Sequence, residues 1–199
     1  CTPYLAIMSS FYFGLQRKKN TCVQKKFSTN INCLISLIIP IKNEYNSIPS
    51  LMSSIKKQSL SQKNFEILFV NDHSSDNSVE LLKEHCSGMP NYKIINQDEG
   101  VHGKKAAIQK GVFHGTGELI VTTDADCKHH KNWLISIYEL YAKNKFKLII
   151  APVIMEGNSL FGKLQSLEFL SLSAATAGAA GIREPIMCNG ANLAFQKST

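Results

Sequence analysis

Acidic side chains follow three apolar runs of this 199-residue chain closely, at positions where they could bind a nucleotide or a metal ion. Glu44 follows the first run, Asp72 the second, and the Asp-x-Asp pair at 124–126 the third. Such a pair at a strand end can hold a hard divalent cation through its oxygens, and a cation bridging to a diphosphate would neutralise charge on a leaving nucleoside diphosphate. Asp72 can accept a hydrogen bond from a nucleotide base, and Lys104 suits a phosphate group as a compact charge.

Each of these residues also has a purely structural interpretation. Asp72 could form an Asx turn, Glu44 could lie at a helix N-terminus, where negative charge is favourable, and Lys104 could be a solvated helix residue. An Asp-x-Asp pair also arises often by chance. His129 and His130 lack the spacing of a histidine metal motif, so we expect both at the surface.

The carboxylates can converge only if the runs before them are neighbouring strands of one sheet. Short apolar runs alternate with helix-length amphipathic segments from Leu34 onward, which is typical of βαβ units and indicates an α/β fold with a mostly parallel sheet covered on both faces. Ligands of such sheets bind beyond the carboxyl ends of the strands. Strands are predicted at 34–39 (stopped by Pro40), 65–70, 92–95, 119–123 and 147–154, and helices at 46–57, 74–85 (capped by Ser74 or Ser75), 103–114, 132–144 and 160–172.

The N-terminal segment has a different character from the rest. Residues 2–15 are apolar and uncharged, fewer than the ~20 residues that span a bilayer, and basic residues follow at once, the reverse of a signal peptide. We therefore expect residues 1–15 to be a partial transmembrane or interfacial helix, 16–33 a basic linker and 34–199 a folded domain on the cytoplasmic side. An ordinary core helix is the alternative for 1–15. The chain is expected to be a piece of a longer protein, truncated at both ends.

Charge and cysteine content limit the partners. The net charge of +7 comes mostly from residues 1–43, which hold six basic residues and no acidic one, so the remainder is nearly neutral and we expect no nucleic-acid partner. No two of the six cysteines have zinc-site spacing, and we expect free, mostly buried thiols.

The apolar segment 164–182 is expected to be a packed helix rather than a membrane-facing one. The loop GVHGKK at 100–105 is not a P-loop, and no Gly-x-Gly-x-x-Gly follows the first strand, so ATPase and nicotinamide readings are excluded.

Taken together, these residues resemble the family 2 glycosyltransferases, whose domain has the Rossmann-like GT-A fold. The order and spacing of the matching segments agree with the family over about residues 34–199, and the apolar segment upstream is similar to that of bacterial membrane-anchored members. The matching segments are ISLIIPIKNE (35–44), ILFVNDHSSDNS (67–78), GKKAAIQKG (103–111), GELIVTTDADC (117–127) and CNGANLAF (188–195).

The resemblance implies a role for each matching position. Asp126, with Asp124, would hold Mg²⁺ or Mn²⁺. The family's catalytic base is an acidic residue that would come after Thr199, so no catalytic residue is expected within the chain. Many members have two consecutive acids where this chain has Asn71 and Asp72, which leaves the base contact to Asp72. The donor would be bound by Pro40, Glu44, Asp72, Lys104 and Asp124, and the sugar and acceptor side would be lined by Asn189, Gly190 and Asn192.

The resemblance further implies an inverting transfer of a sugar from a nucleotide-sugar donor to a saccharide or lipid-linked acceptor. A UDP-sugar is favoured over a GDP-sugar, and the expected location is the cytoplasmic face of the inner cell membrane. One alternative is a sugar-phosphate nucleotidyltransferase, which would have a glycine-rich loop with an arginine where this chain has Pro40 to Glu44. The other is a non-catalytic, nucleotide-binding membrane module.

Overall fold

The computed structural model describes residues 2–17, 31, 33–144, 146–157 and 159–197. The chain divides into two compact units. The first unit combines residues 1–24 with 150–189, and the second combines residues 25–149 with 190–199. The linker predicted at 16–33 lies mostly outside the described residues.

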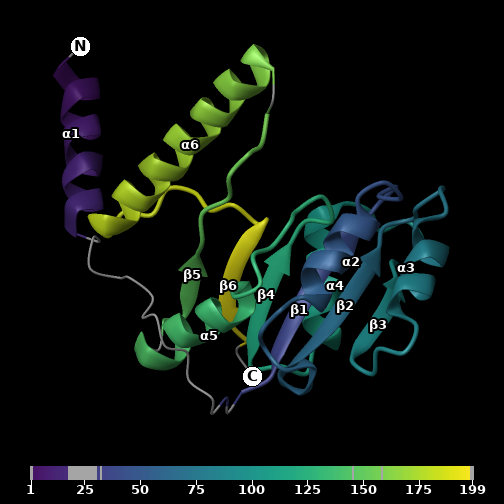
Figure 1. Cartoon of the computed structure of the whole chain (residues 1–199). Helices are drawn as coiled ribbons and strands as arrows, with labels where there is room; N and C mark the ends of the chain where they lie inside the picture. Colours follow the sequence, from purple (N-terminus) through teal and green to yellow (C-terminus); the bar gives the residue numbers. More distant parts are fainter. Residues whose placement is uncertain (1, 18–30, 32, 145, 158, 198–199) are drawn as a thin grey trace. The chain divides into compact units, whose positions relative to one another are not determined.

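A six-stranded sheet forms the second unit, in the order β3-β2-β1-β4-β6-β5 (Figure 1). The central strand β1 is parallel to both of its neighbours, β2 and β4, and β2 is parallel to β3, whereas β6 is antiparallel to β4. The prediction of a mostly parallel sheet is therefore confirmed. The strands are β1 (Ile35–Ile41), β2 (Phe65–Asn71), β3 (Tyr92–Asn96), β4 (Leu119–Thr123), β5 (Leu148–Ile150) and β6 (Asn192–Gln196).

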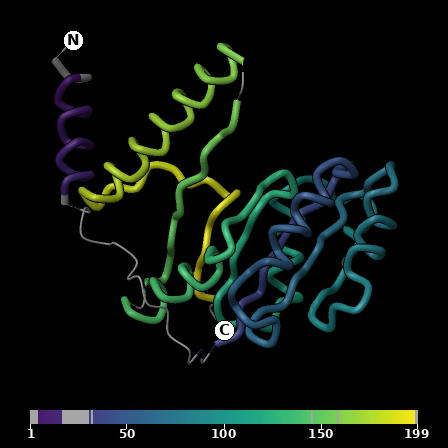
Figure 2. Tube along the Cα trace, in the orientation of Figure 1, coloured from purple at the N-terminus to yellow at the C-terminus, as the bar shows by residue number. Residues whose placement is uncertain are grey.

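Helices cover both faces of this sheet, as Figure 2 also shows along the chain trace. Side chains alternate across a strand, so Leu37 and Ile39 of β1 join the core under α2, α3 and α5, whereas Ile38 packs on the opposite face with Ala107 of α4. The predicted α/β architecture is thus confirmed. The helices of this unit are α2 (Ile48–Lys56), η1 (Gln62–Asn64, a 3₁₀ turn), α3 (Ser78–Cys86), α4 (Lys104–His114) and α5 (Trp133–Asn144).

Strand β1 does not stop at Pro40, as predicted, but continues to Ile41. The ladder between β1 and β4 ends at Ile38, whereas the ladder with β2 runs on to Ile41. At Pro40 the strand is therefore paired on one side only, and a residue without an N–H is tolerated in a strand that has such a free side.

Helix α3 begins four residues later than predicted, at Ser78. The two serines expected to cap it are engaged in the preceding loop: the Ser74 N–H donates to Oδ1 of Asn71 at 3.0 Å, and the Ser75 N–H donates to Oδ1 of Asn43 at 2.8 Å. Side-chain bonds of this kind compete with helix formation. The prediction of Ser74 or Ser75 as the cap is therefore wrong, and Asn77 holds the cap position.

The first unit is built from α1 (Thr2–Arg17) and α6 (Leu160–Gly181). Their C-terminal ends lie side by side (Figures 1 and 2), with glycines at the contact, since a side chain on Gly14 would clash with the carbonyl oxygen of Gly178. Among the described residues, no helix combines the length and apolar character needed to cross a bilayer.

Helix α6 is not the packed helix that the sequence predicts. Only its C-terminal part, at Gly178 and Ala179, is buried. Large apolar side chains occur throughout the remainder and lie on more than one side of it, because residues nine apart in a helix of 3.6 residues per turn, such as Phe161 and Leu170, project in opposite directions. Those exposed by more than half are Leu160, Phe161, Leu164, Leu167 and Leu170.

Candidate functional site

The predicted site residues of the second unit follow three adjacent strands. β2, β1 and β4 are consecutive in the sheet and parallel, so their carboxyl ends lie at the same edge. Asp72 comes immediately after β2, Asp124 immediately after β4, and Glu44 three residues after β1. The sheet therefore delivers the three carboxylates to one edge, as the sequence predicts.

Asp72 is the buried member of this group, with 3% of its surface exposed. Its backbone N–H donates to the carbonyl oxygen of Ile41 at 2.8 Å, which ties the loop to the end of β1. Its carboxylate oxygen Oδ2 accepts from the backbone N–H of Gly103 at 3.0 Å and from Nζ of Lys42 at 3.3 Å. The other oxygen, Oδ1, is buried and has no hydrogen-bond partner among the described residues.

The electrostatics of Asp72 keep it ionised. Burial by itself raises the pKa of this carboxyl, but the hydrogen bond from the Gly103 N–H and the hydrogen bond and charge of Lys42 outweigh that effect, and the pKa is lower than its usual value. The result is a carboxylate with one oxygen satisfied and one buried acceptor available to a ligand that carries an N–H or a positive charge.

Lys104 and Asp124 form the second part of the site, where Nζ of Lys104 lies 2.5 Å from Oδ1 of Asp124. Lys104 is the first residue of α4, after Gly103, which has φ +97°. Gly190, predicted on the sugar side, lies beside this pair, because a Cβ on Gly190 would be 4.0 Å from Nζ of Lys104. Its carbonyl oxygen accepts from Oγ1 of Thr122 at 2.7 Å, which fixes it against β4. Lys104, Asp124 and Gly190 thus come together.

Asp126, the predicted metal ligand, is exposed two residues beyond Asp124, whose side chain is 30% exposed. Both offer only carboxylate oxygens, the ligand type preferred by Mg²⁺ and Mn²⁺. Two accessible carboxylates leave most of the coordination sphere to water and to phosphate oxygens, as is usual for Mg²⁺ bound with a nucleotide. The residues present therefore fit such an ion.

The contacts of Glu44 and Pro40 in this structure are with neighbouring parts of the fold. The Glu44 N–H donates to Oγ of Ser78 at 2.8 Å, and its carbonyl oxygen accepts from the N–H groups of Ser47 and Ile48 at the start of α2. Pro40 lies within β1 opposite Val70 of β2. Their roles in donor binding stay predictions.

A series of contacts between polar and aromatic side chains beside the Asp-x-Asp pair was not predicted. Nε2 of His129 lies 3.0 Å from Oγ1 of Thr123, its ring stacks on Trp133 at a centroid distance of 3.7 Å, and Nε1 of Trp133 donates to Oδ1 of Asn192 at 2.9 Å. Burial lowers the pKa of His129 to about 4, so the ring is neutral at physiological pH. The expectation that His129 is a surface residue is wrong, whereas His130 is exposed as expected.

This chain of contacts links the end of β4 to α5 and β6, and it places Asn192, predicted on the acceptor side, next to Trp133. The single tryptophan four residues after a histidine was the available sequence signal. Asn189 belongs to the first unit, and its role stays a prediction.

The cysteine prediction is confirmed in part. The described cysteines Cys33, Cys86, Cys127 and Cys188 are free thiols, but only Cys86 is fully buried.

Comparison with known proteins gives a consistent family and fold. The sequence profile of the family described as "Glycosyl transferase family 2" matches residues 36–196. The glycosyltransferase AglE of Haloferax volcanii is 29% identical over 100 residues, 50% of this chain and 33% of that protein. The undecaprenyl-phosphate 4-deoxy-4-formamido-L-arabinose transferase of Proteus mirabilis is 34% identical over 99 residues, 48% of this chain and 29% of that protein. The chain thus spans about a third of these relatives' length.

Two solved structures share the fold. The mannosyltransferase PcManGT from Pyrobaculum calidifontis, in complex with GDP-Man and Mn²⁺, matches with a TM-score of 0.73 and 16% identity, over 97% of this chain and 52% of that chain. S. aureus TarS 1-349 in complex with UDP-GlcNAc matches with a TM-score of 0.56 and 21% identity, over 64% of this chain and 36% of that chain.

Proposed function

Because the chain belongs to glycosyl transferase family 2, we propose that it is the donor-binding part of an inverting enzyme that transfers a sugar from a nucleoside diphosphate sugar to an acceptor hydroxyl. The convergence of Asp72, Lys104 and Asp124 at one sheet edge is the observation that supports this most strongly. In the reaction the acceptor oxygen bonds to the anomeric carbon, the bond from that carbon to the diphosphate oxygen breaks, and the acceptor proton passes to a base. We expect that base after Thr199.

Asp72 binds the nucleotide base in this proposal. Its Oδ1 is buried, ionised and without a hydrogen-bond partner among the described residues. A buried acceptor left unpaired costs about 1–3 kcal/mol, so a ring N–H of uracil or guanine that reaches Oδ1 recovers that energy. The Gly103 N–H and Lys42 hold the carboxylate in place while it does so.

Lys104, Asp124 and Asp126 hold the diphosphate end. Lys104 offers its ammonium group to a phosphate oxygen, and in the free protein the same group neutralises Asp124. Asp124 and Asp126 are the residues that would hold Mg²⁺ or Mn²⁺. When bound there, the ion supplies positive charge that neutralises the departing nucleoside diphosphate. Gly190, beside Lys104, leaves room for the sugar because it has no side chain.

The donor is proposed to be a UDP-sugar, with a GDP-sugar as the competing choice. The structural neighbours include one complex with GDP-Man and one with UDP-GlcNAc. A calorimetric titration of the chain with UDP, GDP and ADP in the presence of Mn²⁺ tests this choice. Tighter binding of UDP than of GDP, with ADP weakest, supports it. Equal binding of all three contradicts recognition of the base by Asp72.

The acceptor is proposed to be lipid-linked, with the enzyme at a membrane surface. The Proteus mirabilis relative is named for an undecaprenyl-phosphate substrate. In the first unit, α6 exposes several large apolar side chains, and exposed apolar surface of this kind marks sites of interaction with membranes or other proteins. Co-sedimentation with anionic lipid vesicles tests the location. Binding that is lost when Leu164 and Leu167 are both changed to Ser supports it, and binding that this change leaves intact contradicts it.

A further inference from the structure

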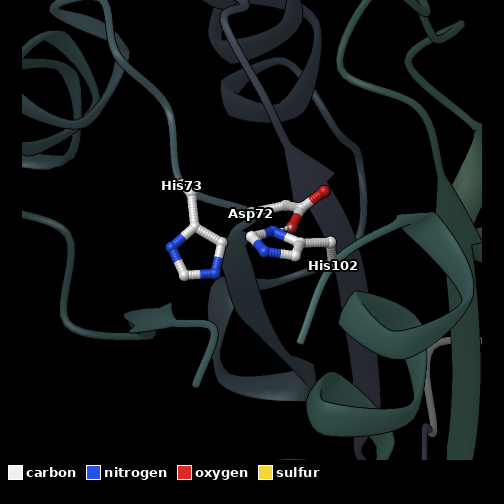
Figure 3. Close-up of side chains that lie close together, drawn as sticks. All are labelled: Asp72, His73 and His102. Atoms are coloured by element: carbon white, nitrogen blue, oxygen red, sulfur yellow. Dashed lines mark ion pairs between the residues drawn. The ribbon is translucent and has the colours of Figure 1, made fainter. Parts of the chain in front are cut away.

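Two histidines lie next to Asp72 at the base end of the site (Figure 3). His73 comes from the loop after β2 and His102 from the loop before α4. One ring nitrogen of each histidine and one carboxylate oxygen of Asp72 lie within 4.8 Å of one another. Nδ1 of His102 is 3.8 Å from Oδ1 of Asp72, and the two rings are 4.6 Å apart between centroids.

The buried oxygen of Asp72 points to a ligand at this position. Asp72 is 3% exposed and its Oδ2 is satisfied by Gly103 and Lys42, so Oδ1 is the free acceptor that faces His102. No described residue gives Oδ1 a hydrogen bond. A cation at this point would satisfy Oδ1 and the lone pairs of two imidazoles together.

The ligand set selects the class of ion. Two imidazoles and one carboxylate suit Zn²⁺, Co²⁺ and Ni²⁺, whereas the two carboxylates at 124–126 suit Mg²⁺ and Mn²⁺. Bonds of about 2.0–2.2 Å to Zn²⁺ place tetrahedral ligand atoms about 3.3 Å apart. The present separations are wider, but both histidines are exposed and can close the difference by rotating about their side-chain bonds.

The loops that bear the two histidines are held together without an ion. Nε2 of His73 lies 3.2 Å from the carbonyl oxygen of Val101, and the Gly103 N–H donates to Asp72. His73 itself has φ +56°, a left-handed conformation that is uncommon for residues other than glycine, asparagine and aspartate. The two loops are therefore held close together in the free protein, and rotation of the two histidine side chains is what remains for an ion to bind.

We propose that Asp72 Oδ1, His73 and His102 bind one ion of the Zn²⁺ class, and that the bound ion excludes the nucleotide base from Asp72. The ion site stands on its own geometry, and its inhibitory effect rests on the proposed function, because the ion and the base compete for the same oxygen. Lys42 stays on Oδ2, and water completes the coordination sphere.

Titration of the full chain with Zn²⁺ alone tests the ion site independently of any nucleotide. The test variant is His73→Asn with His102→Gln, since asparagine tolerates the positive φ at position 73. The matched control is His85→Gln with His114→Gln, two histidines outside the cluster. We expect the test variant to weaken Zn²⁺ binding at least tenfold and the control to leave it within about threefold.

A second measurement needs no variant. Ring-nitrogen NMR of the six histidines during addition of up to one equivalent of Zn²⁺ is expected to shift the His73 and His102 signals first. Zn²⁺ binding that both histidine pairs support equally, or NMR shifts confined to other histidines, overturns the proposed site.

Competition then tests the inhibitory effect. With Mn²⁺ present, one equivalent of Zn²⁺ is expected to weaken UDP binding at least fivefold in the wild-type chain and not in the His73→Asn, His102→Gln variant. If the protein binds Zn²⁺ and UDP at the same time and neither weakens binding of the other, the proposed inhibition is overturned. A chain that binds Zn²⁺ at this cluster but binds neither UDP nor GDP, with or without Mn²⁺, contradicts the proposed function and leaves the ion site supported by the titration with Zn²⁺ alone.

Discussion

The ammonium nitrogen of Lys104 lies 2.5 Å from Oδ1 of Asp124, although twenty residues separate the two in sequence. Lys104 opens α4 and Asp124 follows β4, so the pair connects the two elements that approach the proposed diphosphate from different sides. In the free protein the lysine neutralises a carboxylate that is proposed to bind a metal ion. A phosphate group and an ion arriving together would each take one partner of this pair.

Replacement of Lys104 should therefore weaken binding of the diphosphate and not of the nucleoside. A hydrogen bond to a charged group contributes about 1.5–3 kcal/mol, so Lys104→Gln is expected to weaken UDP binding about tenfold or more in Mn²⁺ and to leave uridine binding unchanged. Lys105→Gln, at the exposed next position, is the control and should stay near wild type. Calorimetry of all three proteins provides the comparison. An equal loss for UDP and uridine would contradict a phosphate role.

Removal of the Trp133 hydrogen bond should loosen the link between α5 and β6. Trp133→Phe keeps a ring against His129 but loses the bond to Asn192, and a loss of about 1–2 kcal/mol in the free energy of unfolding is expected from urea denaturation. Tyr141→Phe removes an exposed hydrogen bond to Glu118 and should cost less. Equal losses in the two variants would show that the bond to Asn192 adds nothing beyond a surface contact.

Ionisation of Glu66 should make the free energy of unfolding depend on pH at acidic pH. Burial alone raises the pKa of Glu66, but hydrogen bonds from Ser36 and Thr116, aided by the charge of Lys93, lower it below 4.5. Since the folded pKa is depressed, the stabilisation by the charged form is fully present above about pH 4.5 and is lost as the pH falls through the folded pKa.

Urea unfolding of the wild type and of Glu66→Gln between pH 3 and pH 6 measures this contribution. The variant is expected to be less stable than the wild type at pH 6, and the difference should shrink toward pH 3. Glu99→Gln, at an exposed position between β3 and α4, is the control and should parallel the wild type. A difference that stays constant over this pH range would rule out the charged form of Glu66 as its source.

The helix pair of the first unit should not tolerate a larger side chain at Gly14. A Cβ there meets the backbone of Gly178, so Gly14→Val must push α1 and α6 apart, at a cost of about 1–3 kcal/mol. Faster proteolysis of α1 in the variant is the expected result. Ser9→Val, at an exposed position of α1, is the matched control. Gly88→Val would be unsuitable because Gly88 has a positive φ. Unchanged proteolysis in Gly14→Val would contradict close packing at this glycine.

The edge of the sheet at which the site lies was predicted from the rule that ligands bind beyond the carboxyl ends of parallel strands. This prediction succeeded because such strands can be recognised from local sequence pattern. Runs such as 67–70 are apolar throughout, as is typical of strands buried on both faces, and the topology of the sheet decides where the residues after each run lie. That reasoning placed Asp72 and Asp124 correctly at one edge. It also predicted α4 to within one residue, since glycines flank that helix on both sides.

The features that were missed depend on contacts between distant segments. The neutral, half-buried state of His129 comes from stacking on Trp133, and the approach of His73 to His102 depends on the loop conformation at residue 73. The continuation of β1 through Pro40 depends on where the ladder with β4 ends. A sequence pattern contains none of this information, because each case is decided by which segment lies opposite.

The most direct test of the donor site is calorimetry of the full chain with UDP and with GDP, each with and without Mn²⁺, on the wild type, Asp126→Asn and the exposed-carboxylate control Asp98→Asn. The site proposed at 124–126 predicts that one nucleotide binds in the presence of Mn²⁺, that omission of Mn²⁺ weakens it at least tenfold, and that Asp126→Asn abolishes this dependence while the control retains it. A folded wild-type chain that binds neither nucleotide, or that binds one equally well in all three proteins whether or not Mn²⁺ is present, would contradict it.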